Sequence, residues 1–187
     1  MKKIILMTTL LLTCISDGPS YASGSSVSGT PITDEMSSKY FSNCVASAQK
    51  EGTMTKETQN QYCACTAMNM QKTMSQEDLV NLSTPGDKAR KSLNKVLISV
   101  NGPCMQYPTH DLIHKKCMTD VKSPEICSCL SNKMGIFMKD ISGRMLPDLL
   151  KKDPNLFDPV TPIMETSEFI ETQRKIALSC ATNPTQK

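Results

Sequence analysis

A cysteine pattern that occurs twice constrains the fold more than any other feature of this chain. The pattern is Cys…Cys-x-Cys…Cys, and its two copies consist of Cys44, Cys63, Cys65 and Cys104, and of Cys117, Cys127, Cys129 and Cys180. Two copies of one pattern indicate a duplicated unit, and an even number of thiols allows every one of these cysteines to be paired. The sequence therefore predicts two related units, each held together by disulfides.

Residues 1–22 have the organisation of a secretory signal peptide. Two lysines precede a short apolar run, and a small-x-small cleavage site ends at Ala22. The run is too short to cross a bilayer. Retention as a lipoprotein would need Cys14 to be acylated, but Thr13 fits the residue before such a cysteine poorly. We expect Ser23 to begin a secreted or periplasmic protein, in a compartment where disulfides persist.

The composition explains why covalent links would be needed. Aromatic residues make up 4% of the chain, tryptophan is absent, and there are 13 methionines. A core with so little ring surface would be marginal in units of this size, and each disulfide typically adds ~3 kcal/mol of stability. The formal net charge of +3 is too balanced to indicate a protein that binds nucleic acid.

Apolar residues recur with the period of an α-helix, and part of the spacing is repeated in the second copy. These residues are Cys63, Ala67, Met70 and Met74, and then Cys127, Met134 and Met138. We therefore expect an all-α fold made of two tandem, related, disulfide-stapled helical bundles. The bundles span 33–104 and 105–187, and a disordered Ser/Gly leader at 23–32 precedes them.

Turn and cap residues predict where several helices begin and end. Ser75 and Asp78 form a capping-box pattern before a short helix. The run Asn101-Gly102-Pro103 is expected to end the fourth helix, and Thr109 is expected to cap the next one. Four prolines make 147–162 the least regular segment of the chain. We expect an exposed binding loop in that segment.

Helix geometry limits the disulfide pairing within each unit. Residues two apart on a helix point about 200° apart, so the two cysteines of each Cys-x-Cys must face different neighbouring helices. The expected pairs are Cys44–Cys63, Cys65–Cys104, Cys117–Cys127 and Cys129–Cys180. The pairing swapped within each unit is the alternative, and the sequence leaves it open. Thiolate metal ligation is a further alternative, although zinc pairs usually have the wider Cys-x-x-Cys spacing.

Two sets of side chains are candidate metal ligands. His110 and His114, the only histidines, share a helical face with the geometry to chelate Zn or Cu. No third ligand is evident, because Asp111 points elsewhere on the helix and Cys117 is expected in a disulfide. Five methionines offer soft thioether ligands: Met68, Met70, Met74, Met134 and Met138. Their helical spacing favours the interpretation that they fill the core.

A basic helix face is the candidate site for an anionic partner. Lys88, Lys91 and Lys95 follow an i, i+3, i+7 spacing, with Arg90 nearby. Such a face attracts anionic lipid headgroups or acidic protein surfaces. An ordinary solvated helix face has the same pattern.

The motifs of familiar enzyme classes are absent from the sequence. There is no Gly-rich phosphate loop, His-Glu-x-x-His or Gly-x-Ser-x-Gly, and pairing of the cysteines removes the usual nucleophile. We therefore expect neither catalysis nor a cofactor, although an active site assembled from residues distant in sequence would leave no such motif.

The helices around each Cys-x-Cys carry a family resemblance. Together with the signal peptide and the Ser/Gly leader, Tyr62-Cys63-Ala64-Cys65 and Ile126-Cys127-Ser128-Cys129 resemble small cysteine-rich exported proteins of intracellular bacteria such as Legionella, in the style of type II secretion. Ile126 departs from the tyrosine of the first unit. The resemblance implies an effector-like binding protein, and it transfers no functional residue.

These features together predict a secreted, non-catalytic binding protein. Its expected partner is a host or envelope protein or an anionic phospholipid surface, reached through the basic face or the Pro-rich loop. The alternative is an extracytoplasmic protein that binds the soft metals Cu or Zn.

Overall fold

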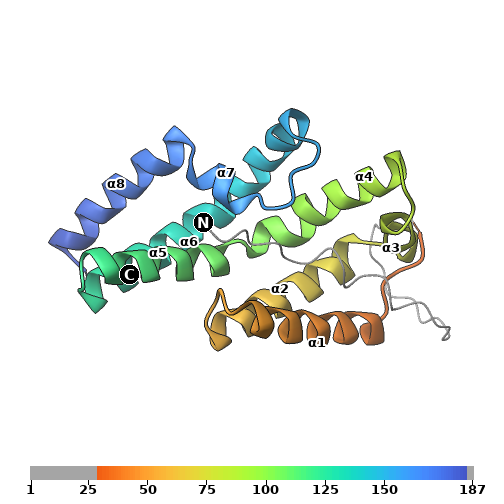
Figure 1. Ribbon diagram of the computed structural model, residues 1–187, viewed down its shortest axis with the longest axis horizontal. Helices are drawn as coiled ribbons and strands as arrows, with labels where there is room; N and C mark the ends of the chain where they lie inside the picture. Colours follow the sequence, from red (N-terminus) through yellow and green to blue (C-terminus); the bar gives the residue numbers. More distant parts are fainter. Residues whose placement is uncertain (1–28, 185–187) are drawn as a thin grey trace.

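The computed structural model describes residues 29–184, and this part of the chain is all α (Figure 1). The predicted signal peptide and Cys14 lie outside the described residues. The helices are α1 (Asp34–Glu51), α2 (Lys56–Thr73), α3 (Gln76–Leu82), α4 (Asp87–Lys95), the π-helical turn η2 (Val96–Asn101), the 3₁₀ turn η3 (Gly102–Cys104), α5 (Gln106–Asp120), α6 (Pro124–Lys152), α7 (Val160–Met164) and α8 (Ser167–Thr182). The predicted all-α class is confirmed.

The helix ends follow local capping chemistry. The Thr33 hydroxyl accepts a hydrogen bond from the Met36 N–H at 3.2 Å, and Gly52 ends α1 in the left-handed conformation. At α3, Ser75 Oγ accepts from the Asp78 N–H at 3.1 Å, while Asp78 Oδ2 accepts from the Ser75 N–H at 2.9 Å. The predicted capping box is therefore confirmed.

Four disulfides tie the helices together in the predicted pairs. They are Cys44–Cys63, Cys65–Cys104, Cys117–Cys127 and Cys129–Cys180, with Cα–Cα distances of 5.4 to 5.8 Å. In the first set, Cys63 reaches back to α1 while Cys65 reaches forward to η3. The two positions of a Cys-x-Cys thus serve two different neighbours, as the helical angle between them requires.

The apolar side chains form two cores along the length of the molecule. The smaller one contains Ile32, Met70, Met74 and Val100, while the larger one is built from α5 to α8. Figure 1 shows α3 and α4 at one end of the molecule and α8 at the other. Met134 and Met138 are buried in the larger core, as Met70 and Met74 are in the smaller one. The methionines thus fill the space that aromatic rings occupy in other cores.

The two halves are also joined to each other. Ser142 Oγ of α6 donates a hydrogen bond to the Gly102 carbonyl oxygen at 2.9 Å, and the Thr55 N–H donates to the Asp111 carboxylate of α5 at 2.7 Å. The equivalence between copies is incomplete, because Val121 is exposed whereas its counterpart Ala48 is buried. The division into two separate bundles at residue 104 stays a prediction.

The chain remains helical between α4 and α5, so the predicted break at Asn101, Gly102 and Pro103 is wrong. Gly102 has φ −48° and ψ −55°, which is right-handed helix. A Cβ at this position would lie 3.0 Å from Leu146 Cδ1, and the Gly102 carbonyl accepts from Ser142. Glycine therefore permits close packing here and does not stop the helix. Pro103 lies in the first turn of η3, where a missing N–H costs little.

Two other predicted boundaries are wrong. Thr109 does not cap α5, because α5 already begins at Gln106. Thr109 lies within the helix, and its side chain is fully buried. Helix α6 continues through Pro147 to Lys152. A proline leaves the carbonyl four residues earlier without its donor. Here that carbonyl belongs to Gly143, which is exposed, so water can satisfy it. The irregular segment is therefore reduced to 153–159.

The predicted disordered leader is ordered at its end. Residues 23–28 lie outside the described residues, but the Thr30 N–H and hydroxyl both donate to the Glu77 carboxylate at 2.9 Å. Pro31 forms an isolated bridge with Ser75, and Ile32 is buried in the smaller core. The prediction of disorder is wrong for residues 29–32, because Ile32 packs into the smaller core and holds this segment there.

We predict opposite effects for two glycine substitutions in α6. In Gly135→Ala the new Cβ would lie 2.9 Å from the backbone carbonyl oxygen of Gln106, and forcing α5 and α6 apart should cost about 1 to 3 kcal/mol. In Gly143→Ala the Cβ would meet nothing within 4 Å, so helix propensity should add about 0.5 to 1 kcal/mol. Urea unfolding of the oxidised protein measures both changes, and equal effects at the two positions would contradict this packing.

Candidate binding site

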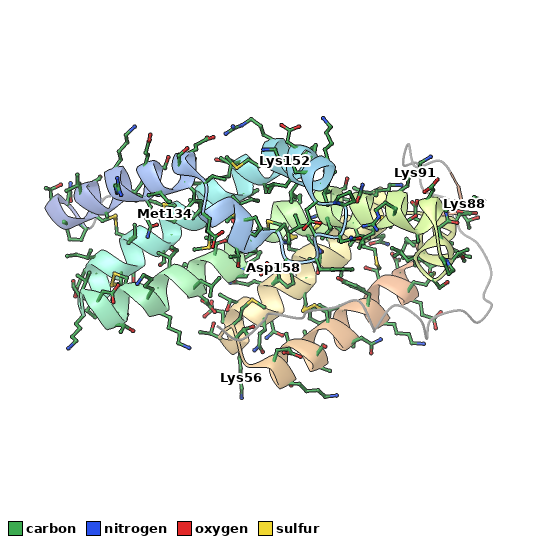
Figure 2. The ribbon with its side chains drawn as sticks, turned by 45° about the horizontal axis from the view of Figure 1, so that its top comes forward. Lys56, Lys88, Lys91, Met134, Lys152 and Asp158 are labelled. Carbon is green, nitrogen blue, oxygen red and sulfur yellow. A yellow bond between two sulfur atoms is a disulfide. The ribbon has the colours of Figure 1, made fainter. Side chains whose placement is uncertain are left out.

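A cavity of ≈ 90 Å³ lies where the two halves of the chain meet. The turn before α2, helix α2, the end of η2, the first turns of α5 and the segment entering α7 all contribute to its walls. The lining residues are Thr53, Met54, Tyr62, Asn101, Met105, Pro108, Leu112, Phe157, Asp158, Pro159 and Val160. Figure 2 shows Asp158 near the middle of the molecule. The cavity is thus formed by segments from both cysteine sets.

The size and lining of the cavity limit what it can hold. A dry apolar cavity of ~150 Å³ binds benzene, and pockets for drug-sized ligands measure roughly 300 to 1,000 Å³. A volume of ≈ 90 Å³ is closer to the size of one branched aliphatic side chain than to that of a drug-sized ligand. Met105, Leu112 and Val160 give apolar walls to such a group, and Phe157 is 56% exposed beside it.

Two polar side chains in the wall have unused hydrogen-bonding capacity. Neither the Tyr62 hydroxyl nor the Asn101 amide forms a hydrogen bond within the described residues. Burial raises the pKa of Tyr62, and the nearby Tyr40 and Asp158 raise it further, so its hydroxyl stays protonated at neutral pH and can donate. An apolar pocket with a few such groups is the usual form of a binding site.

The segment 153–159 is anchored at both ends. Arg90 Nη2 of α4 donates to Asn155 Oδ1 at 2.8 Å. At the other end the Asp158 carboxylate accepts from the Val160 N–H and from the Thr161 hydroxyl, each at 3.1 Å. These contacts hold the backbone on both sides of Phe157. Phe157 therefore lies between two bonded residues of the loop and lines the cavity.

Asp111 of α5 holds the turn before α2, which contributes Thr53 and Met54 to the cavity wall. Its carboxylate accepts from the Thr55 N–H at 2.7 Å, from the Thr58 hydroxyl and, at 3.0 Å, from His110 Nδ1. Burial alone would raise the pKa of Asp111, but the hydrogen bonds from Thr58, Thr55 and His110 hold it below its ordinary value. The ionised carboxylate thereby clamps the start of α2, and with it Met54, against α5.

The predicted basic face is only partly available to a partner. Lys95 Nζ lies 2.6 Å from Asp78 Oδ2, and Arg90 is bonded to Asn155. Lys88 and Lys91 are exposed, and Figure 2 shows them together at the α3 and α4 end of the molecule. The anion site therefore stays a prediction, centred on these two lysines.

The candidate metal ligands do not converge with a third ligand. The His110 and His114 rings stack with centroids 5.9 Å apart, and Asp111 engages His110 while serving α2. Within residues 29–184 there is no group of three or more His, Cys, Asp or Glu side chains placed to hold a metal ion. Of the candidate methionines only Met68 is exposed, and the other four are in the cores. The metal site stays a prediction.

Several important residues of this site were not recognised in the sequence. Tyr62 entered only as part of the resemblance, and Asp111 was expected to point elsewhere. Phe157 and Asp158 lay in the predicted binding loop without being singled out. The one available signal was an aromatic residue in a Pro-rich segment of an aromatic-poor chain, because binding residues are often carried on loops.

Comparisons with known proteins leave the site to be interpreted from its own geometry. No protein-family model, no curated protein and no solved structure matches the chain. None of the helices within the described part combines the length and the apolar character needed to cross a bilayer. The four disulfides fit a protein that acts outside the reducing cytosol.

We predict that Asp111→Asn lowers the free energy of unfolding by about 2 kcal/mol at pH 7, because the three donors around this carboxylate lose a charged acceptor. A carboxylate with a lowered pKa stabilises the fold above the pKa it has when unfolded, about 3.9 for aspartate. The difference between wild type and variant should therefore shrink as the pH falls below about 4.

The matched control is Asp120→Asn on the same helix. Asp120 is half exposed and pairs with Lys116 at 3.0 Å, so its loss should cost less than about 0.5 kcal/mol. Urea unfolding between pH 2.5 and pH 7 measures both variants. An Asp111→Asn effect that does not change with pH would contradict the clamp.

Proposed function

We propose that the protein is a non-catalytic binding protein that acts outside the cytoplasm. It captures an apolar side chain of a partner protein in the cavity between the two halves of the chain. The observation that carries the proposal is the half-exposed Phe157 held at an apolar cavity of ≈ 90 Å³. The resemblance to exported effector-like proteins supports the same class of function, with a host or envelope protein as the partner.

The polar groups of the site suit a peptide segment. A peptide that inserts one aliphatic side chain brings its own backbone N–H and C=O to the rim. The Asn101 amide offers both a donor and an acceptor for that backbone, and the Tyr62 hydroxyl offers a further donor. The π-helical turn η2 ends at Asn101, and π-helical turns are frequent at functional sites. The Cys65–Cys104 disulfide and the Asp111 hydrogen bonds link elements of the wall before a partner binds, which lowers the ordering cost of binding.

The test is selection of short peptides from a display library on the oxidised protein. We expect the selected peptides to share a Leu, Ile, Val or Met anchor. Phe157→Ser should weaken their binding about tenfold, since it removes a large apolar contact. Leu178→Ser is the control, because Leu178 on α8 is 71% exposed and does not line the cavity. Selected peptides without an apolar anchor, or equal losses in the two variants, would refute the proposal.

A second measurement separates this function from binding to a membrane surface. Vesicles containing phosphatidylserine should bind the protein no better than neutral vesicles do. If they bind it strongly, and Lys88→Glu with Lys91→Glu abolishes that binding while Phe157→Ser does not, the basic face is the functional surface and the cavity is not.

A further inference from the structure

One of the four disulfides is more accessible than the others. Cys65 is partly exposed, whereas each of the other seven disulfide cysteines is at most 6% exposed. On the same side of α2, Ala64 is exposed and Met68 is 50% exposed. Cys65 is therefore the more accessible cysteine of this pair, because Cys104 is fully buried. Access to one sulfur of a disulfide is the first requirement for its exchange with a thiol.

The same disulfide has a hydrogen-bond donor beside it. Asn69 Nδ2 lies 3.2 Å from Cys104 Sγ and 3.6 Å from Cys65 Sγ. Within residues 29–184 no other disulfide sulfur accepts a hydrogen bond from a side-chain nitrogen. A donor at this distance is a weak partner for a neutral disulfide and a stronger one for a thiolate. Asn69 is thus placed to stabilise the anion that forms when this bond opens.

We propose that Cys65–Cys104 is a thiol–disulfide exchange site whose co-substrate is a small or peptide thiol. The incoming thiolate attacks Cys65 Sγ, a new sulfur–sulfur bond forms there, and the Cys65–Cys104 bond breaks. The electron pair of the broken bond moves to Cys104 Sγ, where the thiolate accepts a hydrogen bond from Asn69. The product is a mixed disulfide on Cys65 with a free Cys104.

The mixed disulfide has two balanced outcomes. The Cys104 thiolate can attack Cys65 and expel the incoming thiol, which restores the original bridge. A second thiolate can instead attack the sulfur of the bound thiol. That step releases the disulfide of the co-substrate and leaves Cys65 as a thiolate, so two thiols are oxidised and one bridge is reduced. The direction depends on the thiol and disulfide concentrations outside the protein.

The test uses the oxidised protein from Ser23 onward, the expected exported form, which lacks Cys14 and has its remaining eight cysteines in disulfides. The protein is treated with increasing concentrations of reduced glutathione, quenched by alkylation and mapped by peptide mass spectrometry. We expect glutathione on Cys65, an alkylated Cys104, and at least tenfold slower opening of the other three disulfides. Opening of another disulfide at the same rate, or glutathione on Cys104, would overturn the proposal.

The role of Asn69 is tested by Asn69→Leu, which keeps the branched shape of the side chain and removes the donor. Exchange should slow about fivefold, because the leaving thiolate loses its hydrogen bond. Asn60→Leu is the control, since Asn60 is exposed on the same helix and its replacement should leave the rate unchanged. An unchanged rate in Asn69→Leu would also overturn the proposal. Urea unfolding of each variant checks that the fold is retained.

Discussion

Covalent links between neighbouring helices are the constraint on which this structure depends. Phe169 is fully buried in the larger core, but the smaller core has only the partly buried Tyr40 at its edge to supply a ring. Methionine fills much of the remaining space, and its three rotatable bonds make it a flexible filler that specifies position poorly. The disulfides remove that freedom by fixing α1 to α2, α2 to η3, α5 to α6 and α6 to α8. A core of this composition can then hold one arrangement of its helices.

The cavity depends on this arrangement because no single element forms it. Tyr62 is one turn before Cys65 on α2, and Asn101 is one turn before Cys104. The disulfide between those cysteines therefore sets the spacing of the two polar groups in the wall. Asp111 sets the position of the turn before α2, and Arg90 holds the loop that carries Phe157. Covalent and polar contacts thus act together at the place where the two halves meet.

Most of the fold could be predicted from the sequence, but the site could not. Helix positions and the Ser75 capping box follow from local spacing, which acts over a few residues, whereas the disulfide pairing was one of two that the sequence left open within each unit. The errors at Gly102 and Pro147 have a common physical origin, since in both cases a residue that breaks isolated helices was tolerated by its surroundings. The cavity joins residues as distant as Thr53 and Val160. No local pattern in the sequence shows that such distant residues line one cavity. The role of Asp111 likewise depends on its contact with the turn before α2, which the sequence does not reveal.

The uninterrupted helical path from α4 to α5 has a consequence for how the chain could diverge. Here the two sets of cysteines are connected by helical turns, and each residue added to a helix rotates the downstream part of the chain by about 100°. A single insertion or deletion near Asn101 would therefore turn one half of the molecule relative to the other. The π-helical turn therefore helps to fix the rotation of the helices after Asn101 relative to those before it.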